Sequence, residues 1–241
     1  MSRLYVYAVL AAPPRREGEL CGVSGEPLRS VSIGGLAVAV GSVPEAPRAT
    51  LERMRLHDSA VRGLARDAPA LLPMRFGETV ADLEALQACV ARSLPRLRRA
   101  LASVEGGEQM TLRVPATTAP ADRETGPALE RATDGAKSAG TRYLLERKRR
   151  LELERTPPPE LEPLLEHLSP CVRAQRVQRS ESPFGTRVSH LVPVAQRSEY
   201  RARLKEGLRA EPHLHVSVTG PWPPYAFSDI GAFAERGGDP S

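Results

Sequence analysis

His57 and Asp58 are the neighbouring residues in this chain with the most obvious potential for acid–base chemistry. An imidazole beside a carboxylate can move protons at neutral pH. Adjacent residues on a helix point in different directions, however, and His57 falls near the apolar stripe of a predicted helix. We therefore expect His57 to be a buried histidine with satisfied hydrogen bonds, and catalysis is the weaker interpretation.

A metal site has little support in the sequence. His213 and His215 would share one face of a predicted strand, which permits a pair of ligands. No cysteine or carboxylate stands at a spacing that suggests a completed site. Cys21, Cys89 and Cys171 are far apart and odd in number, which favours buried free thiols over disulfides or zinc. We expect no bound metal.

Other catalytic and cofactor motifs are also missing from the sequence. No serine or cysteine stands in a nucleophile-elbow context, and the glycines match neither the Walker nor the dinucleotide-binding spacing. Gly34-Gly35 precedes a predicted strand and not a helix, so it cannot begin a phosphate loop. We therefore expect no catalytic residue, no cofactor and no enzymatic activity.

The basic charge balance leaves one alternative open. The net charge is +5, and the densest basic run is RKRR at 147–150. Pairs such as Glu146–Arg150 would partly neutralise this run on a helix, which favours a solvated face. A basic ferredoxin-like module that binds nucleic acid is the alternative, although the strands predicted at 108–114 and 171–178 lack aromatic residues for base stacking.

The segment LLPMRFG at 71–77 places a charge among bulky apolar residues. Burying an unpaired charge is costly, so a buried arginine needs a partner. We expect Arg75 to be partly buried, with its guanidinium bonded to a carboxylate or to carbonyls at a helix end. Arg75 and Phe76 are candidates for a structural role or for contact with a partner.

The segment TGPWPPYAF at 219–227 holds the only tryptophan of the chain between prolines. Prolines stiffen an extended segment, which then loses little entropy when it docks. We expect it to pack against the N-terminal domain or the domain junction and to fix how the domains sit; docking onto a partner is the alternative. The candidate contact residues are Trp222, Tyr225 and Phe227.

The first part of the chain predicts an α+β domain at 1–106. The expected elements are strands at 3–9, 28–33, 36–40 and 70–76, a helix at 48–66, and a helix that begins at Thr79. The first helix should bury Leu51, Met54, Val61 and Leu64. Thr79 and Asp82 form a capping box for the second helix, and Pro95 should kink or split it.

The rest of the chain predicts a second domain at 107–219 and an extended C-terminal tail at 220–241. The expected strands lie at 108–114, 171–178, 187–194 and 213–219, the helices at 140–155, 160–168 and 197–209, and a mobile loop at 115–139. The order β–(αα)–β–β–α–β is that of a ferredoxin-like, split βαβ domain. The fold class is therefore α+β with two domains.

Composition agrees with a folded protein of the cytoplasm. Hydrophobic residues make up 41% of the 241 residues, enough for packed cores. The first residues lack the apolar core of a signal peptide, and no stretch approaches a transmembrane helix. We expect a cytoplasmic location.

Two segments, LPMRFG at 72–77 and TGPWPPYAF at 219–227, resemble the two signature stretches of the GvpL/GvpF family of gas vesicle proteins. Supporting matches follow in family order along nearly the whole chain: LYVYAV, LAVAVG, RLHDSAV, EQMTLRV, GTRYLL and SHLVPV. Ala226 stands where a serine is common, and Met110 and Thr111 replace a segment that often carries Trp and Gly.

The resemblance implies an accessory or minor structural component of gas vesicles. Members of the family are similar to adaptors that bind the small hydrophobic shell protein and other accessory proteins during assembly. It implies binding and no catalysis, with neither nucleic acid nor membrane as a partner, at a gas vesicle in the cytoplasm. The implied fold is an α+β domain followed by a ferredoxin-like domain.

Overall fold

The computed structural model of this protein describes residues 2–15, 18–115, 156–179 and 185–228. It divides into two compact units, each described by itself. The first holds the described residues of 1–110, 191–197 and 220–241, and the second those of 111–190 and 198–219. The helix expected at 140–155, the basic run within it and nearly all of the loop expected at 115–139 lie outside the described residues.

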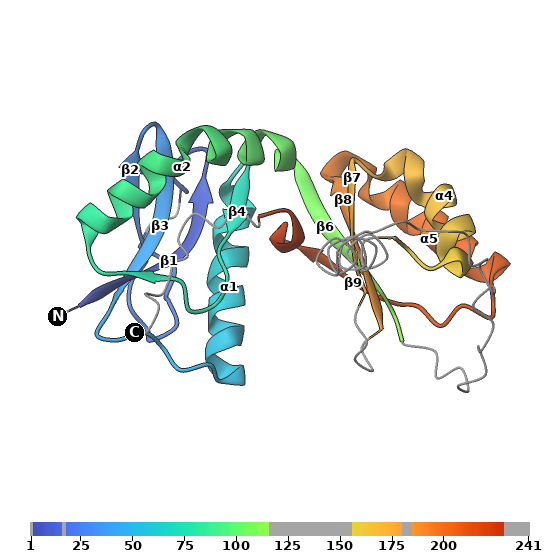
Figure 1. The fold of residues 1–241 in the computed structure, drawn as a ribbon, viewed down its shortest axis with the longest axis horizontal. Helices are drawn as coiled ribbons and strands as arrows, with labels where there is room; N and C mark the ends of the chain where they lie inside the picture. The colour runs from blue at the N-terminus through green and yellow to red at the C-terminus, as the bar shows by residue number, and fades with distance from the viewer. Residues whose placement is uncertain (1, 16–17, 116–155, 180–184, 229–241) are drawn as a thin grey trace, which may run out of the picture. The chain divides into compact units, whose positions relative to one another are not determined.

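The first unit is built on an antiparallel sheet of order β2-β3-β1-β4, with β5 also paired to β1. Its elements are β1 (Arg3–Leu10), β2 (Arg29–Ile33), β3 (Leu36–Val43), α1 (Leu51–Asp67), β4 (Leu71–Pro73), β5 (Thr79–Val80) and α2 (Leu83–Val104), all labelled in Figure 1 except β5. The predicted hairpin is confirmed, with Gly34 and Gly35 at positive φ.

Strand β1 lies at the centre of this core. Seven of its eight residues are buried, including those on both alternating faces, so both faces need cover. Helix α1 supplies part of it, because Val61 and Leu64 pack in one cluster with Tyr5 and Tyr7. Helix α2 also contacts β1 and buries a stripe of its own residues: Leu86, Val90, Leu97, Leu101 and Val104.

The predicted apolar face of α1 is correct only in the C-terminal half of the helix. Val61 and Leu64 are buried, whereas Leu51 is 62% exposed and Met54 is 43% exposed. The buried stripe runs instead through His57 and Ala60. Among the described residues nothing covers the first two turns of α1 on the side of Leu51. The apolar residues in these turns are therefore not part of the hydrophobic core.

The predicted capping box of the second long helix is wrong. Thr79 lies in β5, where it pairs with Tyr5, and the helix begins four residues later at Leu83. Asp82 is the N-cap, and its carboxylate accepts the N–H of Ala85 at 2.8 Å. Pro95 does not split α2, which continues to Val104, because the proline lies on an exposed side where water can replace the missing hydrogen bond.

The second sheet has the order β7-β8-β6-β9. The elements after α2 are β6 (Gly107–Val114), α4 (Glu162–Leu168), β7 (Ala174–Arg179), β8 (Thr186–Pro193), α5 (Arg197–Ala210) and β9 (Ser217–Trp222). Figure 1 shows α4 and α5 side by side, and Arg203 of α5 donates to the carbonyl of His167 at 3.4 Å. The fold is thus mixed α+β with two antiparallel sheets.

The last strand lies later in the chain than predicted. It covers Ser217–Trp222 and not 213–219, because a turn closed by a hydrogen bond from Leu214 N–H to Glu211 O comes first. His213 and His215 therefore precede the strand, and the shared strand face that a metal pair required is not formed.

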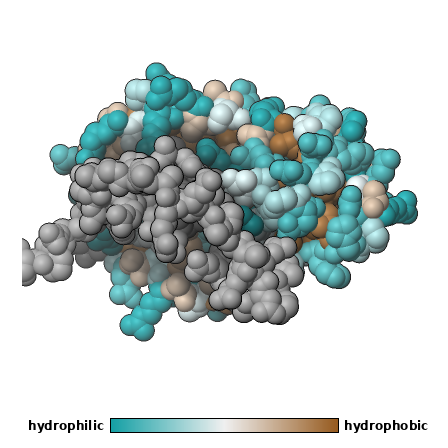
Figure 2. All heavy atoms as spheres, turned by 45° about the vertical axis from the view of Figure 1, so that its right-hand side comes forward, coloured by the Kyte–Doolittle hydropathy of each residue, from teal (hydrophilic) through white to brown (hydrophobic). Residues whose placement is uncertain are grey.

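The surface shown in Figure 2 is mainly hydrophilic, with hydrophobic residues scattered between the polar ones. Within the part of the chain that the structure describes, no helix has both the length and the apolar character needed to cross a membrane. Nor do the described residues bring three or more potential metal ligands together.

Candidate functional site

His57 stands at the centre of a hydrogen-bonded cluster beneath the β4–β5 loop. Its Nε2 lies 3.1 Å from the carbonyl oxygen of Met74, and its Nδ1 lies 3.0 Å from the hydroxyl of Tyr5. A carbonyl can only accept, so Nε2 carries the proton and Nδ1 accepts from Tyr5. The Tyr5 oxygen in turn accepts the N–H of Gly77 at 2.9 Å. Both ring nitrogens are thereby engaged.

Aromatic rings enclose this histidine. The ring of Tyr7 stacks on His57 at 5.6 Å between centroids, and Phe76 meets it edge-on at 5.9 Å. Burial lowers the pKa of His57 and raises the pKa of Tyr5 to about 12, because both charged forms would lose their hydration. The expected buried, satisfied histidine is confirmed, and the neutral ring joins the LPMRFG segment to α1 and β1.

The proline-rich tail lies against the next part of α1. Asp58 and Arg62 form an ion pair of 2.7 Å between Oδ2 and Nε. The guanidinium carbon of Arg62 stands 3.9 Å from the ring centroid of Trp222, a cation–π contact. Tyr225 packs on the core cluster that contains Tyr5 and Val61. As predicted, the tail thus packs against the N-terminal part of the molecule.

The Tyr225 hydroxyl is buried and has no hydrogen-bond partner among the described residues. Burial, followed by the nearby negative charge of Asp58, raises its pKa. The phenol is therefore neutral, and its contribution is apolar packing. That the tail also fixes the arrangement of the two domains stays a prediction.

Backbone contacts hold the tail in place. The N–H of Ala226 donates to Oε1 of Gln109 at 2.8 Å. Gly220 has φ of +130°, and a Cβ there would stand 2.7 Å from the carbonyl oxygen of Gln109. Only glycine permits this approach. Phe227 ends the short 3₁₀ turn Tyr225–Phe227 and is half-buried.

Arg75 departs from expectation. Its side chain is exposed and not partly buried, whereas Met74 before it is buried and Phe76 after it is half-buried. The positive charge of Arg75 lies close enough to Glu78 to oppose the rise that burial causes in the pKa of that carboxyl group. The loop turns outward at this residue, since the backbone of Met74 and Gly77 is held by His57 and Tyr5.

Three partly buried polar groups have no signal in the sequence. Tyr7 donates to Oε1 of Glu26 at 2.5 Å, Arg197 binds Glu108 through two hydrogen bonds, and His190 is bonded to both Tyr200 and Gln175. Their members lie between 10 and 89 positions apart, so no local spacing could reveal them.

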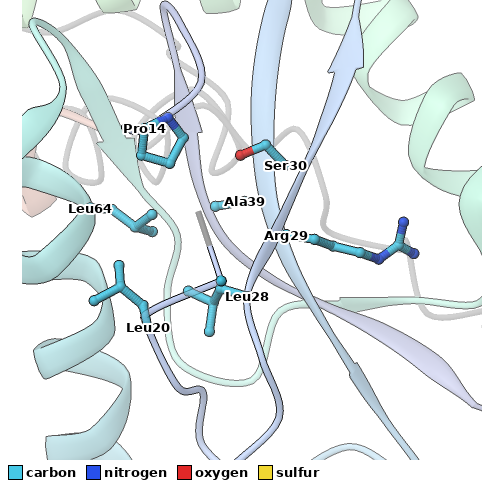
Figure 3. Close-up of a pocket in the computed structure, with 8 residues that line it drawn as sticks. Pro14, Leu20, Leu28, Arg29, Ser30, Ala39 and Leu64 are labelled. Carbon is cyan, nitrogen blue, oxygen red and sulfur yellow. The ribbon is translucent and has the colours of Figure 1, made fainter. Parts of the chain in front are cut away.

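The described pocket near the core has little capacity for a ligand. Figure 3 shows it between α1 and the first sheet, with Leu20, Leu28 and Leu64 converging while Arg29 extends away. It leaves no room for a water-sized sphere. It is a narrow gap between packed side chains, and a cofactor site would need a far larger cavity.

The outer face of α1 offers a different kind of surface. An open groove of about 560 Å³ is lined by Leu51, Glu52, Arg55, Leu56 and Ser59, all exposed. Met54, at 43% exposure, lies on the same two turns of the helix. The two large apolar side chains that line the groove, Leu51 and Leu56, are suited to contact with another protein.

Comparisons with known proteins agree with the resemblance seen in the sequence. The family described as "Gas vesicle synthesis protein GvpL/GvpF" matches residues 3–229. The chain is 29% identical to gas vesicle protein L of Streptomyces sp. (strain CB03234), covering 87% of this chain and 86% of that protein. It is 28% identical to gas vesicle protein L2 of Halobacterium salinarum, covering 93% and 90%.

Solved structures show the same fold. The crystal structure of GvpF from Anabaena sp. PCC7120 superposes with a TM-score of 0.70 at 15% identity, covering 95% of this chain and 96% of that one. GvpF from Microcystis aeruginosa superposes with a TM-score of 0.69, also at 15% identity, covering 94% and 98%.

Proposed function

Because this chain belongs to the GvpL/GvpF family of gas vesicle synthesis proteins, we propose that it is an adaptor that binds the small hydrophobic shell protein during gas vesicle formation. Other gas vesicle accessory proteins are further partners in this proposal, and neither nucleic acid nor a membrane is needed. The protein acts by binding, in the cytoplasm and at the gas vesicle, and catalyses no reaction.

A physical need for such an adaptor follows from how apolar shells assemble. A subunit that associates through apolar surface is prone to aggregate before it is incorporated. A partner that covers this surface transiently restrains aggregation and releases the subunit at the growing shell. The partner itself needs an exposed apolar surface that its own fold does not cover.

The outer face of α1 is the observation that supports this proposal most directly. Leu51 and Leu56 are 62% and 42% exposed, and both line an open groove. Exposed apolar residues scattered singly are ordinary, but a cluster on one helix marks a binding site more often. We propose that this face receives the shell protein, through its apolar groups.

Two finer structural statements belong to the same proposal. The strand order β7-β8-β6-β9 supports a ferredoxin-like second domain, since a split βαβ unit places its first and third strands at the centre. The domain limits at 1–106 and 107–219, with a tail at 220–241, are proposed from the sequence. Arg75, Phe76 and Phe227 remain candidates for structural or partner contacts.

Co-expression with the shell protein tests the proposed function. We expect the wild-type protein to keep the shell protein in the supernatant after centrifugation, and Leu56→Glu to lose this effect. Leu83→Glu is the matched control, because Leu83 on α2 is also 42% exposed. If both variants retain the shell protein in solution equally well, the face of α1 is not the binding site; if the wild type never does so, the adaptor function is wrong.

A further inference from the structure

We propose that the edge strand β7, together with the adjoining arginines of β8 and β6, binds an acidic protein segment in extended form. This surface belongs to the second sheet and does not involve the apolar face of α1. The inference stands independently of the proposed contact with the shell protein.

Strand β7 lies at an edge of the second sheet. In the order β7-β8-β6-β9 it is a terminal strand, so one row of its backbone N–H and C=O groups is not used by the sheet. Four of its six residues are exposed and two, Ala174 and Val177, are half-buried, so none is buried. An extended segment can add to such an edge through main-chain hydrogen bonds.

Arginines gather on one face of the sheet beside this edge. Gln175 and His190 touch through a hydrogen bond, and His190 also bonds Tyr200 of α5, so both point toward α5. Because successive residues alternate, Arg176 and Arg187 point to the opposite face. Arg113 of β6 points the same way for two reasons. Its charge acts on Arg187, and Glu108, an odd number of positions earlier on the same strand, points toward α5, where it binds Arg197.

On the face of the sheet that points away from α5, the end that carries the arginines is exposed. Arg113, Arg176 and Arg187 are all exposed, while Thr111 and Ser189 further along the same face are buried. A segment that pairs with β7 would lie directly beside Arg176. Only the width of β7 would separate it from Arg187 on β8. Specific contact would therefore come from acidic side chains at alternate positions of the incoming segment.

No free carboxylate on strands β6, β7 and β8 balances the positive charge of these arginines. Strands β7 and β8 contain no acidic residue, and the Glu108 of β6 is already bound to Arg197. Burial, followed by repulsion from the charge of Arg113, lowers the pKa of Arg187. Among the described residues none of Arg113, Arg176 and Arg187 has an ion pair, so an acidic segment would relieve the repulsion.

Nucleic acid fits this surface less well than protein does. Single-stranded nucleic acid is usually held by aromatic side chains that stack on the bases. Strands β6, β7 and β8 carry no Phe, Tyr or Trp, and the one imidazole among them, His190, is fully buried. An extended acidic peptide needs only an edge and basic side chains, and both are present.

Fluorescence anisotropy with a labelled peptide that alternates glutamate and threonine tests the proposal on the full-length protein. We expect saturable binding that weakens as salt is added. Arg176→Glu combined with Arg187→Glu should weaken it at least about tenfold. Arg201→Glu, an exposed arginine of α5, is the matched control and should weaken it far less. Circular dichroism shows whether each variant is folded.

Two further probes separate strand addition from simple charge attraction. The same peptide with N-methyl groups on alternate residues cannot donate main-chain hydrogen bonds along one edge, and it should bind at least about tenfold more weakly. Equal binding of the methylated peptide, an equal loss in Arg201→Glu, or no binding of the acidic peptide would each overturn the proposal. So would an oligonucleotide that binds in an Arg176- and Arg187-dependent way when the peptide does not.

Discussion

At the scale of single residues, the two buried histidines, His57 and His190, are neutral structural groups. Each of them uses both ring nitrogens in hydrogen bonds. In the first case the acceptor Met74 O fixes which nitrogen carries the proton. Protonation would add a second N–H facing a hydroxyl that already donates, so the charged ring has no suitable partner.

This arrangement predicts that the protein loses stability in mild acid. Burial lowers the pKa of His190 to about 4 and also lowers that of His57, whereas an unfolded histidine titrates near 6.5. Below pH ~6.5 the unfolded chain therefore binds more protons than the folded one. Stability from His190 is fully present above that pH and should fall by up to about 3 kcal/mol as the pH approaches 4.

Urea unfolding at several pH values between about 7 and 4 measures this loss. His190→Gln is the informative comparison, since an amide can still accept from Tyr200 and donate to Gln175 but does not titrate. The variant should show a flatter pH dependence than the wild type. Equal slopes in the two proteins would mean that His190 is not responsible.

At the scale of elements, α1 makes three distinct kinds of contact surface. Its buried stripe holds His57 and Val61 against the sheet, its flank holds Arg62 against the tail, and its first turns expose Leu51 and Leu56. One helix therefore connects the LPMRFG segment, the proline-rich tail and the proposed contact with the shell protein.

The tail makes a prediction at this scale. Trp222→Ala removes a half-buried ring and its contact with Arg62, and it should destabilise the protein by roughly 1–3 kcal/mol, with no partner present. Thermal unfolding measures the change. Unchanged stability together with lost binding to the shell protein would show instead that the tail is a free docking peptide, and no effect on either would mean that its contacts are unimportant.

The sequence predicted correctly the elements that local geometry determines, and it misplaced those that depend on pairing with distant segments. The hairpin at Gly34-Gly35 and the strand at 3–9 were predicted because local geometry and alternation determine them. Thr79 was assigned to a cap because capping is a local pattern, but pairing with β1 decided its place. The last strand was placed too early for a related reason: a turn at Glu211–Leu214 interrupts an alternating stretch.

The candidate site could be predicted only in part. Local apolar context indicated a buried His57, and the spacing of the tail aromatics indicated docking. The exposure of Arg75 and of Leu51 depends on which elements lie over them, which a periodic pattern does not contain. Pairs such as Tyr7–Glu26 and Arg197–Glu108 form only when distant segments meet.

At the scale of the whole molecule, the family, the fold and the surface all support the proposed binding function. The chain belongs to a family of gas vesicle synthesis proteins and has the fold of GvpF. Its buried histidines are held in structural hydrogen bonds, while the exposed apolar face of α1 has no covering element among the described residues. Binding is the activity that these features support.

The measurement that tests this most directly is a pull-down of the small shell protein from the same cell with the purified, tagged protein. We expect the wild type and Leu83→Glu to retain the shell protein. We expect Leu56→Glu to retain at least about tenfold less shell protein than the wild type. Retention by Leu56→Glu equal to that of the wild type would contradict the proposed surface, and failure of the wild type to retain the shell protein would contradict the adaptor function itself.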